Sequence, residues 1–99
     1  MAFGHMEKEG ISGQFTFGST SGTVTSINAY SSSSEISSSA PAKAGYVAIM
    51  GQVACYSGAI NVQIYQNSGS TLRFALYNNR NYGASNVSWS IRWTYVKKS

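Results

Sequence analysis

The sequence predicts an all-β protein, and we expect one antiparallel β-sandwich or jelly-roll domain. Short segments of alternating or apolar residues recur at hairpin spacing, separated by clusters of Gly, Ser and Asn. No segment has the 3.6-residue periodicity of a helix. Only 10% of the 99 residues are charged, against about a quarter in an ordinary domain. Polarity comes mainly from hydroxyl and amide groups, which suits the solvent-facing sides of strands.

The first six residues, "MAFGHM", differ from the rest of the chain. They have no periodicity and contain the only histidine, His5. We interpret residues 1–6 as an expression-tag remnant and exclude them from the fold prediction, which would make the chain a domain taken from a longer protein.

Residues 7–42 are expected to form the N-terminal strands and a serine-rich loop of the single domain. Strands are predicted at Ile11–Phe17 and Thr23–Tyr30, joined by the turn-rich link "GSTSG". The serine-rich segment that follows is predicted to be a surface loop that leads into a short strand around Ile36. The only proline, Pro41, is expected to end that strand.

Residues 43–99 are expected to supply the core strands. Gly45–Ser57 is apolar on both parities as far as Met50, which predicts a central strand covered on both sides. Gly51 within it indicates a bulge or a close approach of another group to the backbone. Ile60–Tyr65 and Thr71–Tyr77, separated by "NSGS", predict a β-hairpin.

The last strand is the heaviest. Strict alternation from residue 87 to residue 95 predicts a strand with one buried face, which carries Val87, Trp89, Ile91, Trp93 and Tyr95. We expect this face to lie opposite the hairpin across the core. Five large side chains exceed what a thin sandwich usually accepts from one strand, so Trp93 or Tyr95 is expected to lie partly in an interface with another subunit.

The residues needed for common catalytic and metal sites are missing. The chain has no Asp, and its three glutamates lie in the terminal and serine-rich segments, so no pair of carboxylates can be built from the core strands. A Ser-His-Asp triad lacks two of its members. The single cysteine, Cys55, cannot form an internal disulfide and is expected to be a buried, inert thiol. We therefore predict no enzymatic activity, no metal and no cofactor.

Nucleic-acid binding and membrane insertion are also not expected. The net charge is +4, but Lys97 and Lys98 are a terminal pair and the other basic residues are scattered, so no basic stripe can be drawn. The longest apolar stretch, Tyr46–Tyr56, is too short to span a bilayer.

One loop has the composition of a binding site. Residues 77–82 read "YNNRNY", with aromatic rings beside amides and a guanidinium. Such a loop offers stacking surfaces and hydrogen-bond donors for a carbohydrate or a protein. The candidate ligand-binding residues are Tyr77, Asn78, Asn79, Arg80, Asn81 and Tyr82. The alternative is a hydrated turn, because Asn favours turns for local backbone reasons.

The segments "KAGYVAIMGQVACYSG", "NVQIYQNSGSTLRFALYN" and "NVSWSIRWTYVKKS" together resemble the C-terminal modules of tail-fibre and baseplate host-recognition proteins of phages and prophages of Gram-positive bacteria. Those modules have a Gly-Tyr opening an apolar strand, a Gly a few residues later, an aliphatic hairpin and a tail close to Leu-Tyr-Val-Lys. Gly45-Tyr46, Gly51, the hairpin and Tyr95-Val96-Lys97 match, whereas Thr94 replaces an aliphatic residue.

The resemblance implies a homotrimer in a virion tail that binds a cell-wall saccharide on the surface of the host. Two other functions remain open. One is a monomeric bacterial carbohydrate-binding or adhesin module. The other is a structural trimerisation knob without a ligand of its own.

Overall fold

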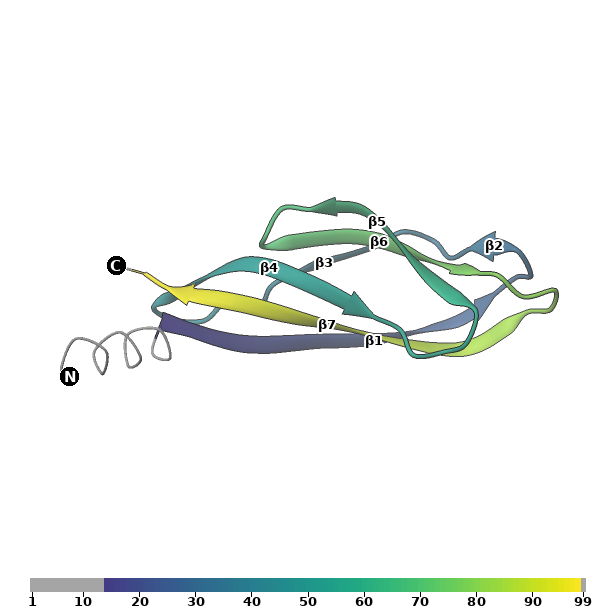
Figure 1. Ribbon diagram of the computed structural model, residues 1–99, viewed down its shortest axis with the longest axis horizontal. Helices are drawn as coiled ribbons and strands as arrows, with labels where there is room; N and C mark the ends of the chain where they lie inside the picture. The colour runs from purple at the N-terminus through teal and green to yellow at the C-terminus, as the bar shows by residue number, and fades with distance from the viewer. Residues whose placement is uncertain (1–13, 99) are drawn as a thin grey trace, which may run out of the picture.

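The computed structural model describes residues 14–98, so the predicted tag remnant and the start of the first predicted strand lie outside the described residues. Between Phe15 and Lys98 the chain has no helix. The strands are β1 (Phe15–Ile27), β2 (Ser31–Ser32), β3 (Ile36–Ser39), β4 (Tyr46–Ala54), β5 (Ile60–Asn67), β6 (Thr71–Asn78) and β7 (Ala84–Lys97) (Figure 1). The prediction of an all-β fold is confirmed.

The strands form two antiparallel sheets. In the first, the order is β1-β7-β4, so the long C-terminal strand is central. In the second, β6 is central, with β5 along one edge and the short β2 and β3 along the other. The predicted hairpin is therefore confirmed as β5-β6, closed by a bond from the Ser68 amide to the Thr71 carbonyl at 3.0 Å.

The molecule is elongated, with principal extents of 59 × 24 × 19 Å, and its two ends differ. We call one the loop end: residues 28–30, 55–59 and 79–83 connect the two sheets there (Figure 1). We call the other the terminal end, because β1 begins and β7 finishes there, with Phe15 paired to Val96.

The core lies between the two sheets and comes mainly from their central strands. The edge of one ring faces the plane of the other where Phe74 meets Trp89, with ring centroids 5.3 Å apart. The fully buried side chains are Leu72, Phe74 and Leu76 from β6 and Val87, Ile91, Trp93 and Tyr95 from β7. The predicted apolar face of the last strand is thus confirmed, and it packs against the hairpin as expected.

The predicted turn at "GSTSG" is wrong, because β1 runs through it without interruption. Gly18 and Gly22 instead give room to aromatic rings of the neighbouring β7. A β-carbon at Gly22 would lie 2.4 Å from Cζ2 of Trp89, and one at Gly18 would lie 3.1 Å from Cε1 of Tyr95. Glycine in a strand often marks such an approach, and here that role, not a turn, explains the sequence.

Gly51 of β4 has the same role, as the sequence indicated. A β-carbon there would lie 2.7 Å from both Leu72 Cδ1 and Trp93 Cζ3, which places side chains of both sheets against one glycine. The pairing of β4 with β7 shifts register between Ala48 and Met50, so the strand also has a bulge, but the bulge lies before Gly51 and not at it.

The prediction that Trp93 or Tyr95 meets another subunit is wrong. Within one chain these side chains are 0% and 1% exposed. The Trp93 indole N–H donates to Thr20 Oγ1 at 2.9 Å, and the Tyr95 hydroxyl donates to the Pro41 carbonyl at 2.7 Å. The glycines opposite these rings leave the space in which a single chain can bury them. The prediction of an interface considered only the number of large side chains and not this space.

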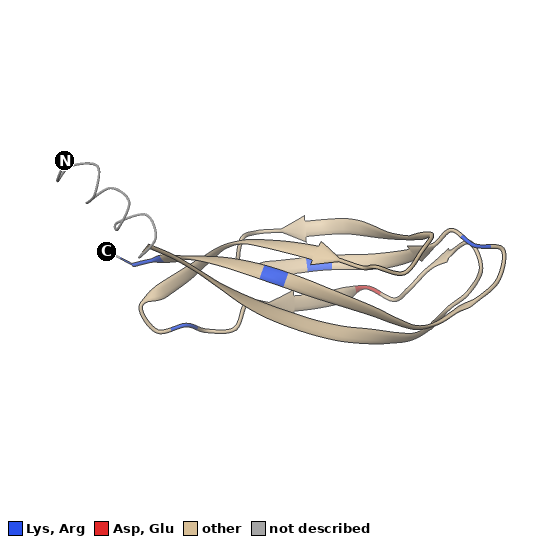
Figure 2. Cartoon of the chain, turned by 60° about the horizontal axis from the view of Figure 1, so that its bottom comes forward, with Lys and Arg blue, Asp and Glu red and all other residues tan. Residues whose placement is uncertain are grey.

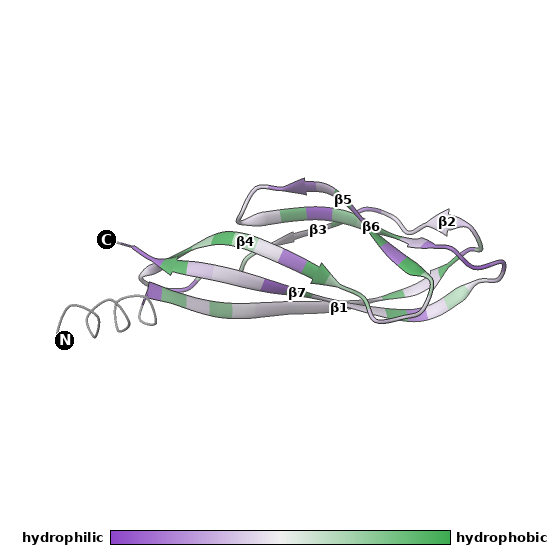
Figure 3. Ribbon diagram, viewed as in Figure 1, coloured by the Kyte–Doolittle hydropathy of each residue, from purple (hydrophilic) through white to green (hydrophobic). Residues whose placement is uncertain are grey.

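The prediction that β4 is central and covered on both sides is also wrong, because β4 is an edge strand. Its apolar run continues onto an exposed surface that we call the apolar outer face. In register, Phe15, Val96 and Val47 form one row across the sheet, and Phe17, Thr94 and Met50 form the next. Its large exposed apolar residues include Phe15, Phe17, Val47 and Met50. Figure 3 shows the apolar stretches of β1 and β4 that contribute to it.

The serine-rich segment lies along the edge of β6 as two short strands, which confirms the strand expected around Ile36. Between them, both carboxylate oxygens of Glu35 accept bonds from Arg73, at 2.8 and 2.9 Å. These hydrogen bonds hold the pKa of the Glu35 carboxyl below its ordinary value.

Candidate functional site

The predicted binding loop lies at the loop end, but Asn78 is part of the fold and cannot contact a ligand. Its side chain is completely buried. Its amide nitrogen donates to the carbonyls of Ile27 (3.2 Å), Asn28 (3.3 Å) and Tyr82 (2.9 Å). Its amide oxygen accepts from the Arg80 backbone N–H at 3.1 Å. The assignment of Asn78 to ligand binding is therefore wrong, because these bonds already occupy its amide group.

Asn78 has this role because three loops must be joined at one point. It is the last residue of β6, opposite the first residues of both β2 and β5. One amide satisfies carbonyls of residues 27 and 28 on one side of this junction and of residue 82 on the other, and these carbonyls are buried or partly buried.

Arg80 also contributes to the junction. Its guanidinium donates from Nη2 to the Gly58 carbonyl, in the loop that precedes β5, and lies 5.5 Å from the centre of the Tyr82 ring. Tyr77 is half-buried within β6. Of the six predicted residues, Asn79, Asn81 and Tyr82 are exposed and Arg80 is partly exposed.

The structure adds two tyrosines that sequence reasoning missed. Tyr30, in the loop after β1, donates its backbone N–H to the Arg80 carbonyl at 3.1 Å. Tyr56 lies in the loop after β4. The Asn79 backbone N–H donates to the Ala59 carbonyl of that loop at 2.9 Å. The exposed fractions of Tyr30, Tyr56 and Tyr82 are 59%, 91% and 61%. Each tyrosine lies near turn-forming residues, but no local signal in the sequence indicates that the three loops meet.

Backbone strain is concentrated at the same end. Tyr30 and Ala59 have φ angles of 49° and 61°, in the left-handed region that side chains other than glycine seldom occupy. Such a conformation costs about 1 kcal/mol or more and persists only where the surroundings impose it. Both residues make a backbone hydrogen bond to the 79–83 loop. The loops are therefore held in one arrangement by their contacts with each other.

The loop end presents groups that can contact a ligand. Arg80 is the only charged residue in the three loops; Figure 2 shows how sparsely charge is distributed elsewhere. The exposed groups are phenol rings, amides and part of a guanidinium, which can stack on a ligand and exchange hydrogen bonds with it. Within residues 14–98, no cluster of His, Cys, Asp or Glu could hold a metal ion. Cys55 is free and partly buried, and packs against the core.

Comparison of the chain with protein-family models, with curated proteins and with solved structures found no match. Across residues 14–98, no helix is long and apolar enough to cross a membrane.

Proposed function

We propose that the chain is a non-catalytic recognition domain that binds a saccharide of a cell surface through its loop end. The observation that carries this proposal is that backbone hydrogen bonds join three loops at one end of the molecule, and each loop carries an exposed tyrosine: Tyr30, Tyr56 or Tyr82. Binding residues are found preferentially on loops that a rigid scaffold positions. Tyrosine rings offer a large contact surface, little flexibility and a hydroxyl group.

The charge of the site suggests which saccharides it would bind. Arg80 presents a planar group of donors beside the Tyr82 ring, and the chain carries a net charge of +4. An anionic wall polymer, such as a teichoic acid, would gain an ion pair there in addition to stacking. Together with the resemblance of residues 43–99 to tail-fibre and baseplate modules, this supports a role at the tip of a virion tail, at the surface of a Gram-positive host.

Variants of the exposed rings test this function. Tyr30→Ala and Tyr82→Ala should each reduce attachment of the purified domain to host cells or to isolated walls by about 10-fold or more, in proportion to the loss of a stacking contact of roughly 1–3 kcal/mol. Tyr65→Ala is the matched control, because Tyr65 is a similarly exposed tyrosine on β5, in the hairpin. Circular dichroism and melting curves should be those of the wild type. Undiminished attachment by both loop variants would refute the proposal.

A second function, assembly, is favoured by the apolar outer face. We propose that the domain is a β-sandwich that self-associates, as a trimer, through this face and not through the buried Trp93 and Tyr95. Exposed apolar patches on soluble domains often mark interaction surfaces. Light scattering at micromolar concentration should give about three times the chain mass. A monomer at all concentrations would contradict the trimer and favour a monomeric carbohydrate-binding module.

A further inference from the structure

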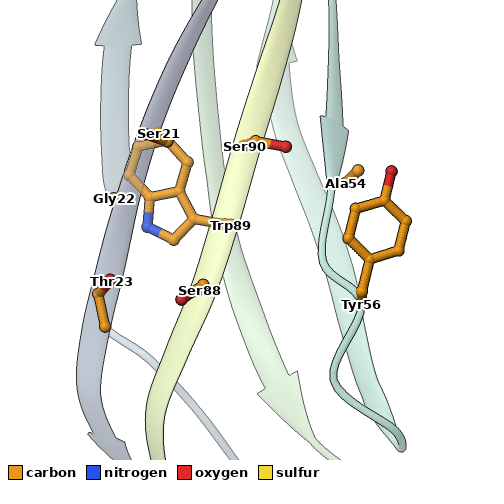
Figure 4. Close-up of a pocket in the computed structure, with 8 residues that line it drawn as sticks. All are labelled: Ser21, Gly22, Thr23, Ala54, Tyr56, Ser88, Trp89 and Ser90. Atoms are coloured by element: carbon orange, nitrogen blue, oxygen red, sulfur yellow. The ribbon is translucent and has the colours of Figure 1, made fainter.

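A shallow hollow opens on the outer side of the β1-β7-β4 sheet, in its half nearer to the loop end. Its volume is about 340 Å³, which is within the range of small-ligand sites, about 300–1,000 Å³. Ser21 and Thr23 of β1 and Ser88 and Ser90 of β7 present their hydroxyl groups on this side, and Tyr56 stands at one margin (Figure 4). Ala54, Gly22 and Trp89 complete the lining.

The hollow exists because this part of the sheet has small residues on its outer side. In register, Ser21, Ser90 and Ala54 form one row across the three strands. Two rows further towards the terminal end, the corresponding row is Phe17, Thr94 and Met50. Large side chains stand on the surface there, and a second hollow of about 390 Å³ lies between Phe17, Ser90 and Arg92. Here the outer side carries only hydroxyl groups and one methyl group.

The hydroxyl groups of the hollow are available to a ligand. Among residues 14–98, no hydrogen bond joins the side chains of Ser21, Thr23, Ser88 or Ser90 to another protein group. Each hydroxyl can both donate and accept. No residue of the lining is charged. Arg92, the nearest cation along β7, is held over the Phe17 ring at 4.0 Å from its centre.

An aromatic ring beside a row of free hydroxyl groups, without a charge, complements an uncharged sugar. The ring would stack on the apolar face of a pyranose, and the row of serines would exchange hydrogen bonds with its hydroxyl groups. Tyr56 is also the residue that joins the hollow to the loop end, because it lies two positions before Gly58, whose carbonyl binds Arg80.

We infer that this hollow is a second binding subsite, which takes a neutral sugar unit between Tyr56 and the serines of β7, next to the Arg80 region of the loop end. The inference rests on the proposed function in that both sites would bind the same glycan. It goes further in naming a separate surface and an uncharged ligand class.

Tryptophan emission can test the subsite. Trp89 belongs to the lining and is partly exposed, whereas Trp93 is fully buried. The wild-type domain should be titrated with neutral oligosaccharides of rhamnose, glucose, galactose and N-acetylglucosamine, and with poly(glycerol phosphate) for comparison. At least one neutral oligosaccharide should change the emission saturably, and Tyr56→Ala and Ser90→Val should weaken that binding by about 10-fold or more. Tyr65→Ala and Ser39→Val, which alter exposed residues of the other sheet, should leave it within 2-fold.

Two results would overturn the inference. The first is the absence of a saturable change with every neutral oligosaccharide. The second is a change that persists in both Tyr56→Ala and Ser90→Val. Cell attachment measured on the same proteins separates the two proposals. Attachment lost in Tyr30→Ala and Tyr82→Ala, without any response to neutral sugars, would leave the loop-end function standing and remove the subsite. A response that depends on Ser90, with attachment unaffected by Tyr30→Ala and Tyr82→Ala, would support the subsite and refute the loop-end proposal.

Discussion

The two halves of the outer surface of the β1-β7-β4 sheet are built from the same three strands but have opposite character. Towards the loop end the surface consists of serine and threonine hydroxyl groups around a hollow. Towards the terminal end it consists of Phe15, Phe17, Val47 and Met50. The inner side of the same sheet is aromatic or aliphatic along most of β7. Burial in the core explains the apolar residues on the inner side. It does not explain why the outer side changes from hydroxyl groups to apolar side chains along the strands.

The difference indicates two kinds of contact. A hydroxyl-lined hollow next to exposed tyrosines suits a small polar ligand. A flat apolar surface suits another protein surface. The two ends are also secured differently. Four hydrogen bonds of the Asn78 side chain hold the loop end, whereas the loop before β4 is tied to β7 at the terminal end by the bond from Tyr95 to Pro41 and by the bond from the Lys98 backbone N–H to the Gly45 carbonyl. The following predictions test this comparison, beginning with the largest expected effect on stability.

Asn78→Ala should reduce the free energy of unfolding by about 2–3 kcal/mol, because three buried or partly buried carbonyls, in two segments of the chain, lose their donor. For a domain of this size that corresponds to a fall in melting temperature of roughly 10–20 °C. Thermal or urea unfolding measures it. Asn79→Ala, an exposed neighbour, is the control and should stay within about 0.5 kcal/mol. Equal effects of both substitutions would show that Asn78 does not secure the loop end.

Gly22→Ala should destabilise the protein by about 1–3 kcal/mol, because the new methyl group would lie 2.4 Å from the Trp89 ring and force a shift in the core. Gly83→Ala is the control, since its nearest neighbouring atom would lie 3.7 Å away. Adding Trp89→Phe to Gly22→Ala should cost less than the sum of the two single changes, since the smaller ring relieves the clash. Strict additivity in this double-mutant cycle would contradict the packing of Trp89 on Gly22.

Tyr95→Phe should cost about 1 kcal/mol at neutral pH through loss of the bond to Pro41. Burial raises the pKa of the Tyr95 phenol above its ordinary value of about 10. A raised pKa in the folded state means that the contribution is complete below pH 10 and is lost as the pH rises through the folded value. The stability of the wild type should therefore fall above pH 10 more steeply than that of Tyr95→Phe, as measured by urea unfolding at several pH values. Parallel pH curves for the two proteins would contradict this assignment.

Phe17→Ser should leave the melting temperature within a few degrees, because Phe17 is half-exposed on the outer side of an edge strand. If the apolar outer face joins copies of the chain, the same substitution should lower the mass measured by light scattering to that of one chain. Ile64→Ser is the matched control, as an exposed aliphatic residue of β5 in the other sheet. An unchanged oligomer in Phe17→Ser would place the interface elsewhere.

Glu35→Gln should have the smallest effect on the free energy of unfolding, because the ion pair with Arg73 is exposed to solvent. The pKa of Glu35 is lowered by Arg73, so the contribution is present above the ordinary value for a glutamate and is lost as the pH falls through the lower, folded value. The difference in melting temperature between pH 7 and pH 3 should therefore be slightly smaller for the variant than for the wild type. A larger difference in the variant would contradict a stabilising pair between Glu35 and Arg73.

Local pattern was sufficient for the strands and for the inner side of the sheet with β7. The alternation of Val87, Ile91 and Trp93 can satisfy only one arrangement, because a slip of one residue would turn every large side chain into water. The hairpin β5-β6 and the short strand at Ile36 were predictable for the same local reasons. The exposed loop around Tyr82 was predictable as well, since asparagine and glycine favour turns.

What the sequence did not indicate depends on contacts between residues far apart in the chain. The local sequence predicts a turn at Gly22, because only the neighbouring β7 shows the Trp89 ring that needs the space of this glycine. The sequence does not show that the Asn78 amide is occupied, because two of the carbonyls it binds lie about 50 positions earlier. Tyr30 and Tyr56 joined the site only when three loops met. Local alternation in the sequence is enough to predict which side of β7 is buried. Which strands are neighbours depends on the tertiary structure. The neighbours determine whether a glycine lies in a turn or against a large side chain, whether a side-chain amide is free to bind a ligand, and whether an apolar strand faces solvent.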